Sequence, residues 1–147
     1  MKKATLLTGD VIARLSSYPD NHFDAMFCDA PYGLSEHGDI APVLQSWLTG
    51  QPYKHPKKGF MGKDWDSFVP GPELWREVFR VLKPGAFALV FAGSRTQDLM
   101  GVSLRLAGFE LRDTVSWLYG SGFPKSLNIG KALEAKKATG SSSPTAM

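Results

Sequence analysis

The sequence predicts an α/β fold with a mostly parallel sheet, and two observations lead to this prediction. Residues 3–28 read as a strand, a short helix and a second strand within about thirty residues, the pattern of a parallel βαβ unit. Residues 86–92 (Ala-Phe-Ala-Leu-Val-Phe-Ala) are almost wholly apolar, as is typical of a central strand in a parallel sheet. The chain of 147 residues is long enough for one domain with its own hydrophobic core.

The first βαβ unit has recognisable boundaries. A strand is expected over residues 3–8, and Asp10 is expected to cap a short helix over residues 11–17. Strong turn chemistry follows at residues 18–21 (Tyr-Pro-Asp-Asn). The second strand then runs up to Asp29.

Residues 35–71 form the least regular stretch, an insertion loop with a short helix expected over residues 40–48. Lysines and aromatic residues are interleaved with glycine and proline from residue 53 to residue 65. This mixture suits a nucleic-acid surface, where lysines meet phosphate and rings meet bases. A solvated loop with a few anchoring aromatic residues explains it equally well. The candidate DNA-binding residues of this loop are Lys57, Lys58 and Lys63.

The most regular helix is expected to begin at Pro72, since proline at the first helical position is pre-organised for a helix start. Apolar residues recur at helical spacing and predict a buried stripe. The stripe consists of Leu74, Trp75, Val78, Phe79 and Leu82. Residues 83–85 (Lys-Pro-Gly) are expected to stop this helix before the strand at residues 86–92.

A second strand–helix–strand unit follows. Ser94 and Gln97 predict a capping box at the start of the next helix, and Gly108 is expected to close it. A further strand is expected over residues 109–117. A last short helix is expected near residues 129–137.

Composition and charge narrow the class of protein. No apolar run approaches the roughly 20 residues of a membrane-spanning helix, so no membrane partner is expected. The single cysteine, Cys28, rules out an internal disulfide, suits a reducing cytoplasm and lies in an apolar run, so we interpret it as a core residue. The net charge of +3 comes wholly from residues 125–147, because the first 124 residues carry 13 basic and 13 acidic side chains. A mild basic tail fits an anionic partner and is equally common on a solvated surface.

Polar chemistry follows the second strand at a place where packing does not require it. Residues 29–32 (Asp-Ala-Pro-Tyr) combine a carboxylate, a rigid proline and an aromatic ring. In open parallel sheets ligands bind beyond the carboxyl ends of the strands. We therefore expect Asp10, residues 29–32 and residues 93–95 (Gly-Ser-Arg) to line one crevice. The carboxylate and a backbone carbonyl can accept hydrogen bonds from an amino group, and the ring can stack on the flat heterocycle that carries this group.

An ordered series of motifs extends this pattern over nearly everything from residue 4 to about residue 133. The motifs are residues 29–34 (Asp-Ala-Pro-Tyr-Gly-Leu), 59–66 (Gly-Phe-Met-Gly-Lys-Asp-Trp-Asp), 80–85 (Arg-Val-Leu-Lys-Pro-Gly), 107–109 (Ala-Gly-Phe) and 117–126 (Trp-Leu-Tyr-Gly-Ser-Gly-Phe-Pro-Lys-Ser). With this series the chain resembles the DNA amino-methyltransferases that act on adenine N6 or cytosine N4, especially their phage-type members.

The resemblance implies a doubly wound, Rossmann-like α/β fold and methyl transfer from S-adenosylmethionine to the exocyclic amine of a base flipped out of double-stranded DNA. By this resemblance Asp29 and the backbone carbonyl of Pro31 would hold the amine, and Tyr32 would stack on the base. An aspartate at the start of the motif favours adenine N6 over cytosine N4.

The resemblance also suggests cofactor and DNA contacts. Asp29 and Asp10 are the candidate cofactor contacts, although Asp10 is equally good as a helix cap. Arg95 and Lys125 join the loop lysines as candidate DNA-binding residues. No metal site is predicted, because the three histidines lack ligand spacing with Cys28.

The chain departs from the family pattern in two ways. Ala30 replaces the first of two prolines. The glycine-rich cofactor strand (Phe-x-Gly-x-Gly) is expected after the target-recognition region, and the chain stops before either. Residues 91–94 (Phe-Ala-Gly-Ser) look like that motif, but Arg95 stands where its second glycine would be, so we interpret them as a strand-to-helix turn.

These departures define the alternatives. Residues 1–137 are expected to form the catalytic part of a methylase domain, and residues 138–147 a flexible tail or the truncated start of a target-recognition region. A complementary C-terminal half or a homodimer would complete such a protein. The alternative is a remnant that binds DNA without catalysis. A methyltransferase acting on RNA or on protein glutamine is disfavoured, because too few residues precede Asp29 to hold a cofactor motif upstream.

Overall fold

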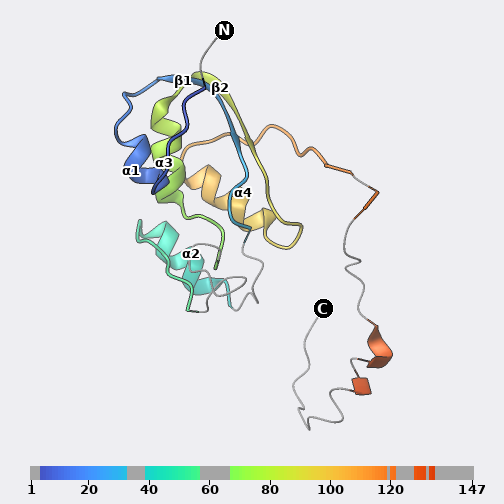
Figure 1. Cartoon of the computed structure of the whole chain (residues 1–147). Coiled ribbons are helices and arrows are strands. Elements are labelled where there is room, and N and C mark those ends of the chain that lie inside the picture. The colour runs from blue at the N-terminus through green and yellow to red at the C-terminus, as the bar shows by residue number, and fades with distance from the viewer. Residues whose placement is uncertain are drawn as a thin grey trace. The chain divides into compact units, whose positions relative to one another are not determined.

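Within the described residues the sheet is a pair of parallel strands. The computed structural model of the chain describes residues 4–32, 39–56, 67–118, 120–121, 128–131 and 133–134. The elements follow the order α1 (Val11–Leu15), β1 (Phe23–Cys28), α2 (Ala41–Leu48), α3 (Pro72–Val81), β2 (Leu82–Val90) and α4 (Gln97–Leu106) (Figure 1). All six elements belong to the first of two compact units, Met1–Arg112, and the second unit is Asp113–Met147.

The two strands pair in parallel, so the predicted α/β class with a parallel strand pair is confirmed. Phe23 pairs with Leu82, but Ala25 pairs with Phe87, so β2 carries extra residues over this interval. The extra residues include Pro84 and Gly85, and Gly85 adopts the left-handed conformation at φ 79°. Proline and a left-handed glycine are typical of a bulge, where a ladder hydrogen bond is absent anyway.

This bulge corrects the predicted boundary between helix and strand. Residues 83–85 were expected to stop the helix in a turn, but α3 ends at Val81 and β2 begins at the next residue. Pro84 and Gly85 lie in the bulge within β2, so no separate turn separates α3 from the strand.

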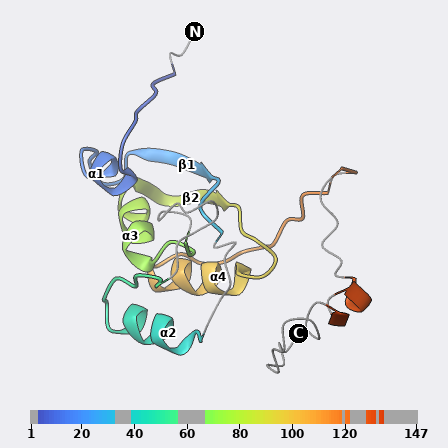
Figure 2. The ribbon, with the colours of Figure 1, turned by 60° about the horizontal axis from the view of Figure 1, so that its bottom comes forward.

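The two faces of the strand pair differ. Met26 and Cys28 of β1, with Ala86, Ala88 and Val90 of β2, pack against the helical core. The side chains between them on the other face, Phe27, Phe87 and Leu89, are exposed. Figure 2 shows α3 and α4 together on one side of the two strands. Alternate residues of a strand point to opposite faces, so one face is covered by helices and the other, which we call the open face, is covered by none of the described helices.

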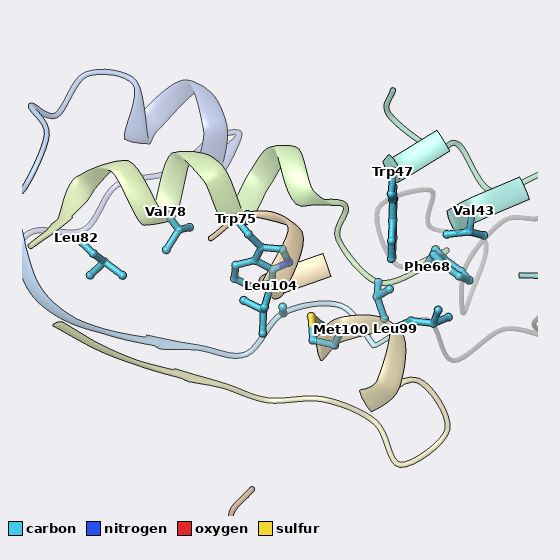
Figure 3. Close-up of a cluster of buried hydrophobic side chains, with 12 residues drawn as sticks. Val43, Trp47, Phe68, Trp75, Val78, Leu82, Leu99, Met100 and Leu104 are labelled. Atoms are coloured by element: carbon cyan, nitrogen blue, oxygen red, sulfur yellow. The ribbon is translucent and has the colours of Figure 1, made fainter. Parts of the chain in front are cut away.

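The hydrophobic core lies on the helix-covered side. Trp75 of α3 is completely buried, and Val78 on the next turn is also buried, as the predicted stripe requires. Figure 3 shows Val43, Trp47 and Phe68 gathered at one end of the cluster and Val78 and Leu82 at the other. Phe79, also predicted in the stripe, is instead 49% exposed, and its ring meets the ring of Phe109 edge-on.

One guanidinium anchors the turn that leads into β1. Arg80 of α3 donates hydrogen bonds to the backbone carbonyls of Leu15, at 3.1 Å, and Tyr18, at 2.9 Å. It also forms an ion pair with Asp20 at 2.7 Å. The arginine therefore connects α3 to the turn after α1, which fixes where β1 begins.

The predicted strands on either side of this pair are wrong for the described residues. Residues 4–8 and 109–118 form no strand, and Leu6 is 90% exposed. A strand exists only when a neighbour supplies its hydrogen bonds, and within the described residues the sheet consists of β1 and β2. Local pattern alone therefore did not decide these two segments.

The remaining helices lie close to their predicted positions. The first, α1, is two residues shorter than predicted, and α2 begins one residue later. The predicted capping box is wrong, since the cap of α4 is Thr96 rather than Ser94. Gly108 closes α4 as predicted, with φ at 110° and the N–H of Phe109 donating to the carbonyl of Leu104 at 3.1 Å.

In the second unit, residues 129–131 and 133–134 are helical, within the predicted last helix. The rest of that helix and the predicted tail at residues 138–147 lie outside the described residues. Each helix in the described part of the chain is too short or too polar to cross a membrane.

Candidate functional site

The candidate site begins where the two strands end together. Cys28 is in register with Val90, and the backbone N–H of Phe91 donates to the carbonyl of Cys28 at 2.9 Å. The ladder therefore continues one step beyond the strands. Residues 29–32 and residues 91–96 leave the same edge of the sheet side by side, which is the edge at which parallel sheets bind ligands.

Asp29 and Tyr32 contact each other directly. The phenol of Tyr32 donates a hydrogen bond to a carboxylate oxygen of Asp29. Burial, and then this hydrogen bond, raise the pKa of Tyr32 to about 12. The phenol therefore stays protonated at neutral pH and remains a donor to the carboxylate.

The backbone of Tyr32 is held from the other strand end. The hydroxyl of Thr96 donates to the carbonyl of Tyr32 at 2.6 Å. Gly93 lies against the same residue, because a Cβ added to Gly93 would be 3.3 Å from the Cβ of Tyr32. The turn after β2 thus supports the loop after β1, as the expected convergence of residues 29–32 and 93–95 requires.

Sequence reasoning did not identify Thr96 as a site residue. A polar β-branched residue next to a predicted helix start reads as a cap, and nothing in the sequence pairs it with a residue 64 positions away. Gly93 was identified only as part of the turn.

Ala30 and Pro31 between the two polar residues are partly or fully buried. Ala30, which stands where the family pattern has its first proline, is only 6% exposed and belongs to the core cluster. Pro31 is half-buried. The apolar middle of the motif therefore fixes the loop to the core, while its polar ends remain at the surface or near it.

Asp10 does not join this group. Its carboxylate accepts a hydrogen bond from the N–H of Ala13 at 2.9 Å, which caps α1. Among the described residues no hydrogen bond or ion pair links it to Asp29. The cap interpretation of Asp10 is confirmed, and its expected place in the crevice rested on a strand over residues 3–8 that does not form.

Of the five candidate DNA-binding residues, the described part of the chain contains Arg95. This arginine is exposed in the turn between β2 and α4, directly before Thr96. The others lie outside the described residues; they are Lys57, Lys58, Lys63 and Lys125.

Cys28 precedes the site and faces the helical core. Burial, and then the charge of Asp29, raise the pKa of its thiol. The neutral thiol is therefore favoured, which agrees with its interpretation as a core residue rather than a nucleophile.

No protein-family model and no solved structure matches the chain. The site is therefore interpreted from the contacts and chemistry of its own residues.

Proposed function

We propose that this chain is the base-binding part of a DNA amino-methyltransferase, acting on the exocyclic amine of a flipped base, adenine N6 in preference to cytosine N4. One observation carries the proposal. Residues 29–32, the motif that resembles this family, directly follow a parallel strand, and their Asp29 and Tyr32 side chains meet at its carboxyl end.

Each of the three residues has a role in this proposal. Asp29 accepts a hydrogen bond from the exocyclic N–H, and the carbonyl of Pro31 accepts a second. Two acceptors aimed at one amine raise the electron density on its nitrogen and orient it. Tyr32 offers its ring to the base, and a base–aromatic stack contributes about 1–3 kcal/mol to binding.

The described residues fit the base but not the cofactor. S-adenosylmethionine would supply the methyl group when bound. A family member holds it with a glycine-rich strand, whereas the turn that looks most like this motif has Arg95 in place of its second glycine and its Gly93 packs against Tyr32. Asp29 is the described residue that best suits a cofactor contact, and we assign the rest of that contact to other parts of the protein.

An open sheet face supports a partner for this part. Phe27 and Phe87 are exposed on the face of β1 and β2 that no described helix covers. Parallel sheets are covered on both faces. We propose that a complementary C-terminal half covers this face and supplies the cofactor side, with a homodimer as the other way to cover it and with double-stranded DNA in the cytoplasm as the substrate.

Methyl labelling of DNA tests the proposal. Unmethylated DNA of mixed sequence is incubated with labelled S-adenosylmethionine and the chain completed by the partner that supplies the cofactor side, and its nucleosides are identified by mass spectrometry. N6-methyladenine is expected, and Asp29→Asn should reduce its formation on the order of 100-fold, the scale of losing one electrostatic contact at a reacting centre. Asp24→Asn, at the opposite end of the same strand, is the matched control and should retain activity. Equal labelling by Asp29→Asn and the unaltered chain would contradict the proposal.

The alternative, a remnant that binds DNA without catalysis, is favoured by the lack of a glycine-rich cofactor strand among the described residues. Calorimetry separates the two functions for this chain by itself. Binding of duplex DNA without binding of S-adenosylmethionine would support the remnant, and micromolar binding of S-adenosylmethionine would count against it.

A further inference from the structure

Two buried hydroxyl groups, one at the start of α4 and one within it, donate hydrogen bonds to backbone carbonyls outside the helix. The side chains of Thr96 and Ser103 are the buried polar side chains of the described residues. Ser103 donates to the carbonyl of Pro70 at 2.7 Å, and Thr96 donates to the carbonyl of Tyr32 at 2.6 Å. A buried hydroxyl must find a partner, so each bond explains why its residue is tolerated in the interior. The difference lies in what each bond holds.

Thr96 occupies the cap position of α4 but does not cap it. A threonine at this position normally accepts a hydrogen bond from an N–H group of the first turn. Here its side chain makes no such bond, and its hydroxyl hydrogen is directed to the loop after β1 instead. The helix gives up a local interaction, and the loop gains one that spans 64 residues.

Tyr32 is thereby fixed at two points. Thr96 holds its carbonyl, and Asp29 accepts from its phenol. Gly93 leaves just enough room for the Tyr32 side chain to lie against the turn. A ring whose plane is set beforehand loses less conformational freedom when it stacks on a base, so fixing the backbone beneath the ring reduces the cost of ordering it on binding.

We propose that Thr96 is a positioning residue, whose hydroxyl sets the backbone of Tyr32 so that the ring and Asp29 are held in the geometry for receiving a base. This inference rests on the proposed function for the identity of the ligand. The positioning itself is a property of the loop, so it can be measured without any methyl transfer.

The titration of Tyr32 gives that measurement. The groups that act on its phenol are Asp29 and Cys28, besides its burial. The protein is labelled with ¹³C at the tyrosine Cζ carbon, and Tyr32→Phe identifies its resonance. With a pKa of about 12, only about a quarter of Tyr32 is ionised at pH 11.5.

Thr96→Val keeps the shape of the side chain and removes the hydroxyl. We expect it to release the loop, so that the ring gains solvent and the bond to Asp29 weakens. Both changes lower the pKa of Tyr32, by one unit or more toward its ordinary value near 10. Thr96→Ser, which keeps the hydroxyl, should restore the unaltered titration.

Ser103→Ala is the matched control. It removes a buried hydroxyl-to-carbonyl bond of nearly the same length from the same helix, at a distance from Tyr32 in the sequence. If Thr96 were only a structural residue, both variants would weaken folding and neither would alter the Tyr32 titration selectively. Circular dichroism at each pH confirms that the compared chains are folded.

Three results would overturn the proposal. They are an unchanged Tyr32 titration in Thr96→Val, the same shift in Ser103→Ala, and a Thr96→Val chain that fails to fold while Ser103→Ala folds. The last result would show that the hydroxyl holds the fold itself.

The methyl-transfer assay adds a separate readout. Thr96→Val should lower kcat about 10-fold to 100-fold with little change in the KM for DNA, the scale of a misplaced catalytic group. Loss of the effect of Asp29→Asn would overturn the proposed function, while the Tyr32 titration would still decide the role of Thr96.

Discussion

Both faces of the β1–β2 pair carry apolar side chains, but the described helices cover only one of them. On the helix-covered face the strands present small residues, such as Ala86 and Ala88, which let α3 and α4 approach. On the open face they present Phe27 and Phe87, which are 67% and 76% exposed. The exposed large apolar side chains of the two strands therefore lie where the described helices do not reach.

This difference is the observation behind the proposed partner. A solvated sheet face alternates polar residues with buried ones, whereas three large apolar side chains follow one another across this face. The covered face holds the core of the first unit, and the other face is where the proposed partner would bind. Substitutions of the same kind on the two sides should therefore have unequal effects.

The largest difference is expected for truncation of an aromatic ring. Trp75→Ala on the covered side empties a fully buried site and should reduce the free energy of unfolding by about 3–5 kcal/mol. Phe87→Ala on the open face should change it by only about 0.5 kcal/mol or less, because its ring is already in solvent. Urea denaturation of both variants measures the contrast. Equal losses would mean that the open face is covered in the protein alone.

A smaller difference is expected for enlargement of an alanine. Ala88→Leu adds volume against the helical core and should cost about 1–3 kcal/mol through overpacking. Ala25→Leu adds the same volume at an exposed position of β1 and should be nearly neutral. Thermal unfolding of the two variants provides the measurement, and a lower stability for Ala25→Leu than for Ala88→Leu would reverse the assignment of the faces.

The smallest effect is expected at an exposed ion pair joining the strand starts. The ammonium group of Lys83 donates to the carboxylate of Asp24 and, by this bond and its charge, lowers the pKa of that carboxyl. A lowered folded-state pKa stabilises the fold above the unfolded-state pKa, and this contribution is lost as the pH falls through the folded value. The melting temperature of the unaltered chain should slightly exceed that of Asp24→Asn at pH 7, and the difference should shrink as the pH is lowered until Asp24 is protonated.

Salt provides the control for this last comparison. The pair is exposed, so raising the ionic strength at pH 7 should shrink the difference as acid does. A difference that survives both acid and salt would assign the effect of Asp24→Asn to packing rather than to charge.

Sequence reasoning succeeded where the determinants are local. The apolar stripe and the first-position proline of α3, and the apolar run of β1, identified these elements nearly to the residue. It failed at residues 4–8 and 109–117, whose patterns fit strands but whose partners are not supplied by the described sheet. Pro84 and Gly85 were expected to break the chain into a turn because a bulge depends on register with a partner strand.

The site shows the same division. Asp29 and Tyr32 could be singled out because a carboxylate and a ring after an apolar strand serve no packing purpose. Thr96 could not, because its partner is distant in the sequence and its position already had a local explanation as a cap. Asp10 was the reverse case, because the local explanation as a helix cap is the one that the structure shows.

The bond between the Tyr32 phenol and Asp29 has a consequence for selectivity. A carboxylate bonded only to water would lose that water whenever a flat molecule entered the site. The carboxylate of Asp29 already accepts a hydrogen bond from Tyr32. The phenol bonds one of the two carboxylate oxygens, which leaves the other oxygen as the acceptor for the amine of a base bound as proposed. A base that presents a keto oxygen there would be repelled by the carboxylate, whereas an amine would donate to it. The tyrosine would thus set the direction in which the second oxygen faces the incoming amino group.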